Sequence, residues 1–159
     1  MHEPAIDRAD RRLLRELGQH GRATSVELAQ AVHLSASAVA RRQRALEDAG
    51  VIRGYHADID PAAFGLTTTV VVQVTLKGQS EADLSEFEAA VQRCDSVQRC
   101  FLMSGSDDYL LVLLVRDLVD FEHVHKTQLS RLPHVGRIQS SFALRDVVHR
   151  ALPADLLRE

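Results

Sequence analysis

The chain has 159 residues, of which 45% are hydrophobic and 26% charged, and its formal net charge is −3. This length and composition fit one medium or two small soluble domains, and no apolar run approaches the ~20 residues of a membrane span. Because residues 1–12 lack the apolar stretch of a signal peptide, we expect a cytoplasmic protein that does not contact a membrane. Cys94 and Cys100 lack paired spacing, so we expect both to be buried small apolar side chains.

Apolar residues at helical spacing open the chain. Leu13, Leu14 and Leu17 follow a pair of aspartates, which predicts a helix that ends near Gly18. The sequence TSVE at residues 24–27 has the T-x-x-E pattern of a capping box, in which the first and fourth side chains satisfy each other's backbone N–H groups. We therefore expect a second, short helix after this box.

A third helix is predicted after a tight turn. Ser35 or Ser37 is a suitable N-cap, and the helical pattern continues to Ala49 before Gly50, a residue type that commonly ends helices. A short capped helix, a tight turn and a longer helix are the parts of a helix-turn-helix, which here falls within residues 25–44.

The chain changes character near residue 60. Residues 51–59, VIRGYHADI, have strand character with Gly54 as their turn, and an Asp-Pro pair then breaks regular structure. Beyond it the pattern predicts the β-α-β-β-α-β order of a ferredoxin-like sandwich, with two helices on one face of a sheet. The strands are expected at residues 67–77, 97–103, 109–116 and 135–147, and the helices at 81–93 and 118–131. We expect another subunit to cover the second face of the sheet.

Arginines gather on the third predicted helix. The first sixty residues carry nine arginines and nine acidic residues, and RRQR at residues 41–44 holds three of those arginines. Ser37, Arg41 and Arg44 share one helix face, and Arg42 lies between this face and the inner one. Small residues at the helix start let it approach a DNA groove, and arginine binds guanine edges or phosphates through two donors. The alternative to a DNA-binding face is a basic face that only contacts solvent. The helix cap and the turn before the third helix favour the DNA-binding face.

Two adjacent acids, Asp107 and Asp108, precede an almost unbroken apolar run in SGSDDYLLVLLV, residues 104–115. Their spacing fits a tight turn between antiparallel strands, and the rim of a ligand pocket stays open as an alternative. The spacing implies no His or Lys partner for acid–base catalysis. His123 and His125 face different ways on a helix, which argues against a metal site. We expect no catalytic residue, no metal and no cofactor.

The pattern as a whole resembles a known family. Similar segments occur in the same order in the leucine-responsive and asparagine-responsive (Lrp/AsnC) regulators: IDRADRRLLRELGQHGRATSVELAQAV, LSASAVARRQRALEDAGVIRGYHADIDPAAFG, the GSDDY loop and LPHVGRIQSSFALRDV. The resemblance covers about residues 5–148. It implies an α+β protein with an N-terminal winged helix-turn-helix domain followed by a ferredoxin-like βαββαβ sandwich. The expected bounds are residues 1–60 for the first domain, 61–66 for a linker, and 67–159 for the second domain with its C-terminal tail.

The resemblance also implies site residues. The DNA-facing positions of the family fall on Ser35, Ser37, Ala38, Arg41, Arg42 and Arg44. Many relatives have valine on the inner face of the third helix where this chain has Gln43, which would either loosen packing or point at DNA. The effector pocket of the family lies between dimers, and its positions fall on Met103, Ser104, Gly105, Ser106, Asp108 and Tyr109, with farther walls from Leu118, Gln139 and Ser141.

In that pocket we expect Asp108 to hold the α-ammonium group of an amino acid, while loop N–H groups and serine hydroxyls hold its carboxylate. Asp107 takes a variable loop position, and Ser106 stands where relatives often carry an acid. The expected protein is a sequence-specific DNA-binding transcriptional regulator and not an enzyme. It binds promoter or operator DNA, forms homodimers that assemble into a larger ring of eight chains, and senses an amino acid or a related metabolite.

Two alternatives come from other functional classes. Sirohaem decarboxylases share this two-part architecture, but the arginine face argues against an enzyme of that kind. A sensing module that modulates partner regulators without touching DNA would oligomerise and bind ligand, yet would show no salt-dependent DNA affinity.

Overall fold

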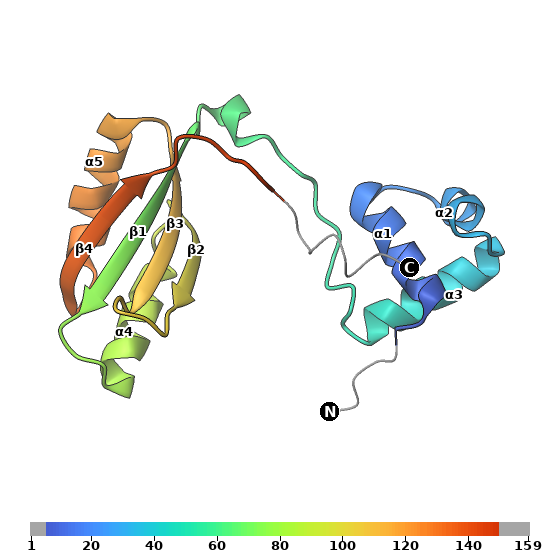
Figure 1. Cartoon of the computed structure of the whole chain (residues 1–159), viewed down its shortest axis with the longest axis horizontal. Helices are drawn as coiled ribbons and strands as arrows, with labels where there is room; N and C mark the ends of the chain where they lie inside the picture. The colour runs from blue at the N-terminus through green and yellow to red at the C-terminus, as the bar shows by residue number, and fades with distance from the viewer. Residues whose placement is uncertain (1–5, 150–159) are drawn as a thin grey trace. The chain divides into compact units, whose positions relative to one another are not determined.

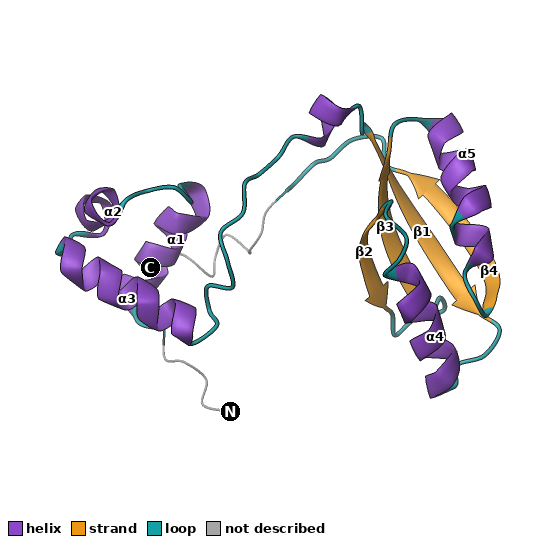
Figure 2. Cartoon of the chain, turned by 180° about the vertical axis from the view of Figure 1, so that it is seen from behind, coloured by secondary structure: helices purple, strands orange, loops and turns teal. Residues whose placement is uncertain are grey.

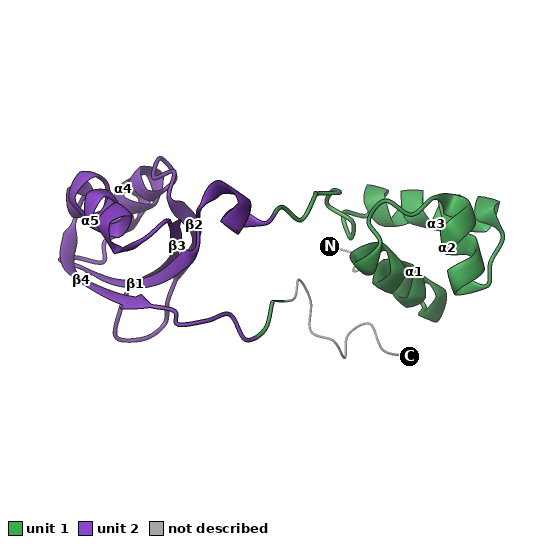
Figure 3. Cartoon of the chain, turned by 90° about the horizontal axis from the view of Figure 1, so that it is seen from above, with its two compact units in different colours: residues 1–59, 148–159 green, residues 60–147 purple. Residues whose placement is uncertain are grey.

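The structure, a computed structural model, describes residues 6–149. It divides into two compact units, one built from the amino-terminal helices and the other from residues 60–147 (Figure 3). Figure 1 shows the first unit as a group of helices and the second as a sheet with helices packed on it. Within residues 6–149, none of the helices has both the length and the apolar character needed to cross a membrane.

The first unit contains the three expected helices, α1 (Arg8–Gln19), α2 (Ser25–Val32) and α3 (Ala36–Asp48). Side chains just before each helix accept bonds from its first turn, because those backbone N–H groups have no partner within the helix. Asp7 caps α1 and Thr24 caps α2, each in a reciprocal capping box. The helices bury a shared apolar cluster built around Leu13, Leu28, Val32, Val39 and Leu46.

The strand hairpin expected at residues 51–59 is not formed, and this expectation is corrected. These residues follow α3 without strand pairing. The N–H groups of Val51 and Ile52 instead bond to the carbonyl of Leu46, at 2.9 and 3.1 Å, and so close the end of α3. A strand needs a neighbouring edge to satisfy its backbone groups, and within the described residues this segment has none.

The second unit has the predicted β-α-β-β-α-β order. Its strands are β1 (Thr68–Leu76), β2 (Val97–Leu102), β3 (Tyr109–Val115) and β4 (Val135–Phe142), and its helices are α4 (Glu81–Val91) and α5 (Leu118–Thr127). Short 3-10 turns, η1 (Pro61–Phe64) and η2 (Leu129–Arg131), precede β1 and follow α5. All pairs in the sheet are antiparallel, in the order β2-β3-β1-β4. This is the ferredoxin-like sandwich expected from the sequence.

The last strand is shorter than predicted. It ends at Phe142, although the pattern predicted a strand to residue 147. Its partner β1 begins only at Thr68, and the bond from the Ala143 N–H to the Thr69 carbonyl, 2.9 Å long, is the last contact along this edge. Residues 144–149 have no strand beside them in the part of the chain that the structure describes.

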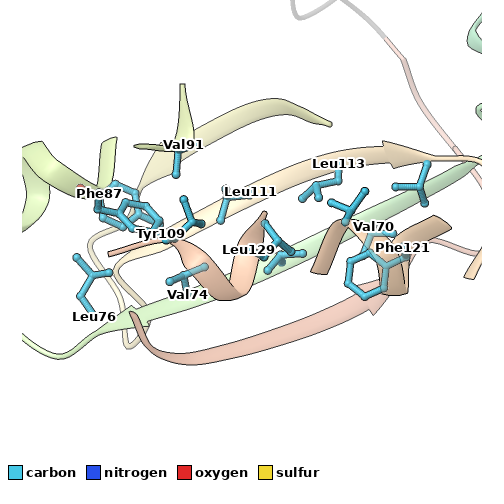
Figure 4. Close-up of a cluster of buried hydrophobic side chains, with 14 residues drawn as sticks. Val70, Val74, Leu76, Phe87, Val91, Tyr109, Leu111, Leu113, Phe121 and Leu129 are labelled. Atoms are coloured by element: carbon cyan, nitrogen blue, oxygen red, sulfur yellow. The ribbon is translucent and has the colours of Figure 1, made fainter. Parts of the chain in front are cut away.

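Both helices of the second unit lie on one face of the sheet, as Figure 2 shows. Alternate residues of β1 and β3 point toward them and are buried, with Val72, Leu111 and Leu113 fully enclosed. Aromatic rings from both helices complete this core (Figure 4), and the ring of Phe87 lies 4.4 Å from that of Tyr109. The other alternate residues of β1 and β3 point to the opposite side of the sheet and are only half-buried. We call this side the open face and define it by Val71, Gln73, Thr75, Leu110, Val112 and Leu114.

The cysteines were expected to be buried, and this is wrong for one of them. Cys94 is half-buried, and burial raises the pKa of its thiol. Cys100 is exposed because it lies on β2, a strand at the edge of the sheet. Phe101 and Leu102, the next two residues of β2, are exposed as well.

Candidate DNA interface and effector site

One face of α3 combines small and basic side chains. Ser37, Ala40, Arg41 and Arg44 recur at helical spacing, and all four are exposed. Arg41 and Arg44 border a shallow depression lined by Ala40, Ala45 and Asp48. Small residues beside two guanidinium groups let the helix backbone approach a groove while the arginines reach its walls. Sequence reasoning missed Ala40, although its spacing from Ser37 and Arg44 already placed it on this face.

The start of α3 is held by Ser35. Its hydroxyl accepts the Ala38 N–H at 3.2 Å and lies 3.2 Å from the hydroxyl of Ser37. Ala38 is half-buried, so it lies at the border of the exposed face rather than on it. Of the predicted DNA-facing residues, the structure therefore brings Ser35, Ser37, Arg41 and Arg44 to the surface at one end and one side of α3.

Arg42, which was predicted to face DNA, does not share that face, because its side chain is turned toward α1. Its Nη1 atom donates to Asp7 at 2.7 Å and to Asp10 at 2.8 Å, both at the start of α1. Its side chain is only 26% exposed. Hydrogen bonds to Asp10 and then to Asp7 raise the pKa of the Arg42 guanidinium. A helix rotates about 100° per residue, so the side chain after Arg41 turns toward α1 instead of outward.

Gln43 is bonded to the segment that follows α3. Its Nε2 atom donates to the hydroxyl of Tyr55 at 2.6 Å, and that hydroxyl donates to Glu47 at 2.7 Å. The segment after α3 is thus fastened back onto the helix. Burial, followed by the bond to Glu47, raises the pKa of Tyr55.

The two acids of the β2–β3 loop have different surroundings. Asp108 is 7% exposed, and one of its oxygens accepts the backbone N–H of Leu76 at 2.7 Å. Its other oxygen accepts the amide of Gln79 at 2.5 Å. Asp108, which was predicted to bind the ligand, therefore fixes the chain where β1 ends, with both carboxylate oxygens bonded within the unit.

Asp107 is the acid that belongs to a polar network on the open face. Its Oδ1 atom accepts from the Thr75 hydroxyl and from Arg137 Nη2, each at 3.0 Å, and its Oδ2 atom accepts from Gln73 at 3.2 Å. The bond from Arg137, followed by that from Thr75, lowers the pKa of Asp107. The Arg137 side chain stays 61% exposed, while that of Asp107 is 13% exposed. An ionised carboxylate thus lies beside an accessible guanidinium.

A small depression adjoins this network. Its lining includes Gln73 and Leu110 from the sheet, and Met103, Gly105, Ser106 and Asp107 from the loop. Tyr109 borders it, but its hydroxyl donates to Glu88 at 2.8 Å and its ring is 1% exposed. Tyr109, which was predicted to line the effector pocket, therefore borders the depression while its side chain is part of the core. Burial and the bond to Glu88 raise its pKa.

The remaining predicted effector residues are spread along the sheet. Ser104 is exposed in the loop, and Gln139 pairs with Gln73 across β4 and β1, beside the network. Ser141 pairs with Val71, farther along the same strands. Leu118 follows the end of β3, whereas the loop precedes its start, so one chain places them at opposite ends of that strand.

Sequence reasoning missed Gln73, Thr75 and Arg137. The signal was present in β1, where Gln73 and Thr75 are the polar members of an otherwise valine-rich alternation. Nothing in the local sequence linked Arg137 to the loop, because the contact spans 30 residues. Among residues 6–149, no group of three His, Cys, Asp or Glu side chains is placed to hold a metal ion.

The chain matches models of two domain families in sequence. A winged helix-turn-helix DNA-binding model matches residues 6–53, and an Lrp/AsnC ligand-binding domain model matches residues 69–153, more than half of the chain. The proline dehydrogenase transcriptional activator of Rhodobacter capsulatus is 38% identical over 94% of this chain and 97% of its own length.

Solved structures of similar proteins superpose on nearly the whole length of this chain. A Neisseria meningitidis transcriptional regulator in complex with L-methionine has a TM-score of 0.90 at 34% identity, covering 97% of this chain and 100% of that one. A feast or famine regulatory protein of M. tuberculosis complexed with L-methionine has a TM-score of 0.83 at 33% identity, covering 94% of this chain and 99% of that one.

A helix-turn-helix unit joined to a ligand-binding α+β unit defines a DNA-binding transcriptional regulator and not an enzyme. The chain belongs to the Lrp/AsnC family, in which the amino-terminal helices bind DNA and the sheet unit carries the ligand-binding domain.

Proposed function

We propose that this regulator reads its operator with the exposed face of α3, through Arg41 and Arg44 in the major groove. The observation that supports this is the pairing of two exposed guanidinium groups with small neighbours at helical spacing. Ser35 and Ser37, at the helix start, lie where backbone N–H groups and hydroxyls can hold a phosphate.

The effector in this proposal is an α-amino acid bound beside the β2–β3 loop. Arg137 offers an accessible cation for the α-carboxylate, and Asp107 offers an anion for the α-ammonium group. The depression between Met103, Gly105 and Leu110 would take the side chain. L-methionine, which the two similar regulators bind, is the first ligand to test.

A second copy of the chain would cover the open face. Val71, Leu110, Val112 and Leu114 are half-buried apolar side chains on a sheet face that no helix within residues 6–149 covers. Covering such a face removes apolar area from water and is the usual way for a two-layer unit to form a dimer. Larger rings would then be built from these dimers.

One experiment tests DNA reading and sensing together. A duplex is first selected from a random-sequence library with the full-length protein, and its affinity is then measured with each of the twenty amino acids. The proposal requires a selected duplex that binds at least tenfold more tightly than a scrambled one, and an amino acid that shifts this affinity. A protein that selects no duplex would overturn the DNA-reading proposal, and twenty unchanged affinities with an unchanged melting midpoint would overturn the effector class.

A further inference from the structure

The ion pair between Arg42 and the start of α1 joins two distant parts of the first unit. A single nitrogen of Arg42 donates to both Asp7 and Asp10, residues that precede it by 35 and 32 positions. The Asp10 side chain is 12% exposed, so its charge is largely removed from water. A carboxylate in that position is costly unless it is paired and hydrogen-bonded.

The same two acids also form the cap of α1. Asp7 accepts the N–H of Asp10 at 2.8 Å, and Asp10 accepts the N–H of Asp7 at 3.1 Å. Each carboxylate gives one oxygen to the helix start and the other to Arg42. The first turn of α1 and the middle of α3 are therefore held by one set of four bonds.

This set of bonds acts on the rotation of α3 about its own axis. Arg42 lies on the turn of α3 that also carries Arg41 and Arg44, and these two side chains are exposed. Because neighbouring residues of a helix are about 100° apart, fixing the direction of Arg42 fixes the directions of Arg41 and Arg44.

We infer that Arg42 is a positioning residue for DNA recognition: it is clamped by Asp7 and Asp10, sets the rotation of α3, and does not contact DNA itself. This inference rests on the proposed DNA face of Arg41 and Arg44. In this inference Asp7 and Asp10 support DNA binding, although their negative charges are repelled by DNA phosphates.

That sign makes the inference testable. Electrostatics alone predicts that removing an acid near DNA strengthens binding, because the phosphates repel it. The clamp predicts the opposite for Asp7 and Asp10, and only for the cognate sequence. Asp48 provides the matched control, because it is an exposed acid on α3 beside Arg44 and is not part of the clamp.

The experiment compares Asp7→Asn, Asp10→Asn and Asp48→Asn in the full chain, on the selected duplex and on a scrambled duplex of the same composition. Asparagine at position 7 keeps one oxygen for the helix cap and replaces the oxygen that faces Arg42 with an NH2 group, so the bond to Arg42 is lost together with the charge. We expect Asp7→Asn and Asp10→Asn to lose about three- to tenfold in affinity for the selected duplex, as for one ion pair, with no loss on the scrambled one. Asp48→Asn should bind both duplexes as well as the unmodified protein or more tightly.

A variant that simply unfolds would lose both duplexes alike, so the ratio of the two affinities separates positioning from stability. Clamp variants that keep this ratio, as Asp48→Asn does, would overturn the inference. So would Arg42→Ala if it lowered the slope of log affinity against log salt by about one unit, the mark of a lost phosphate contact. If Arg41→Ala and Arg44→Ala kept their affinity while Asp7→Asn lost it, the proposed DNA face would be wrong, and Arg42 would position another surface of α3.

Discussion

Asp107 and Asp108 are adjacent in the chain, yet they bind different parts of the sheet unit. Asp108 is enclosed and accepts the Leu76 N–H at 2.7 Å, while Asp107 accepts Arg137 at 3.0 Å on the open face. One acid therefore holds the end of β1, and the other belongs to a charge pair whose arginine is exposed.

Replacing these acids should separate stability from sensing. Asp108→Ala leaves a buried backbone N–H without a partner, so it should lower the free energy of unfolding by about 1–3 kcal/mol. Asp107→Ala should cost less stability and abolish the shift in melting midpoint on adding L-methionine. Urea denaturation and ligand titration measure the two effects. An Asp107→Ala protein that keeps its ligand response would place the effector elsewhere.

Arg41 and Arg44 should each contribute to DNA affinity in a way that salt reveals. If Arg44→Ala removes a phosphate contact, affinity falls on all duplexes and the salt slope drops by about one unit. If it removes a base contact, one operator position loses discrimination worth about 1–3 kcal/mol. Arg93→Ala, an exposed arginine of the sheet unit, is the control. If Arg41→Ala, Arg44→Ala and Arg93→Ala had equal DNA affinities at several salt concentrations, the assigned face would be wrong.

His134 has a left-handed backbone, with φ of 61°, and its ring lies 3.2 Å from Asp83 and 2.8 Å from Glu86. Substitution by alanine removes both contacts and keeps the strained backbone, whereas glycine removes the contacts and relieves the strain. We expect His134→Gly to be more stable than His134→Ala by about 1 kcal/mol in urea denaturation. Equal stabilities would show that neighbouring residues have relaxed this turn.

Asp120 should influence stability in acid. Bonds from Arg116 lower its pKa to about 2 from the ordinary value of 3.8. A depressed folded-state pKa means that the stabilisation is present above 3.8 and is lost as pH falls through about 2. Between pH 5 and 2, the unmodified protein should therefore lose more stability than Asp120→Asn. Parallel urea midpoints across this range would count against the pair.

The open face should control the assembly state. Leu110→Asp places a charge in the middle of a half-buried apolar surface, and we expect it to convert the oligomer to monomers in light scattering. Gln98→Asp, which adds the same charge to an exposed residue of β2, should leave the mass unchanged. An unaltered mass for Leu110→Asp would show that copies meet on another surface.

Local patterns predicted the elements well where the signal itself was local. The capping box at Thr24 and the valine alternation of β1 involve residues a few positions apart, and both are present as predicted. Arg42 could not be placed in this way. Its direction depends on carboxylates more than thirty residues away, and its spacing alone is compatible with either face of the helix.

The acidic loop shows the same limit. Asp107 and Asp108 differ by one position in the chain, yet Asp108 accepts a backbone N–H of β1 and Asp107 accepts the Arg137 side chain of β4. Only the register of the antiparallel pairs settles that choice, through Val74 opposite Tyr109 and Thr75 opposite Arg137. Strand existence can be read from composition, but register is a property of the assembled sheet.

Tyr55 gives the segment after α3 a defined point of attachment. Its hydroxyl is held by Gln43 and Glu47, so the free tether toward the sheet unit begins after residue 55 and not at the end of the helix. This attachment joins the segment to α3 at Gln43, which is next to Arg44 in the chain. Tyr55→Phe removes the hydroxyl that makes this attachment. We expect this variant to bind DNA and the effector as the unmodified protein does, while the effector changes DNA affinity less.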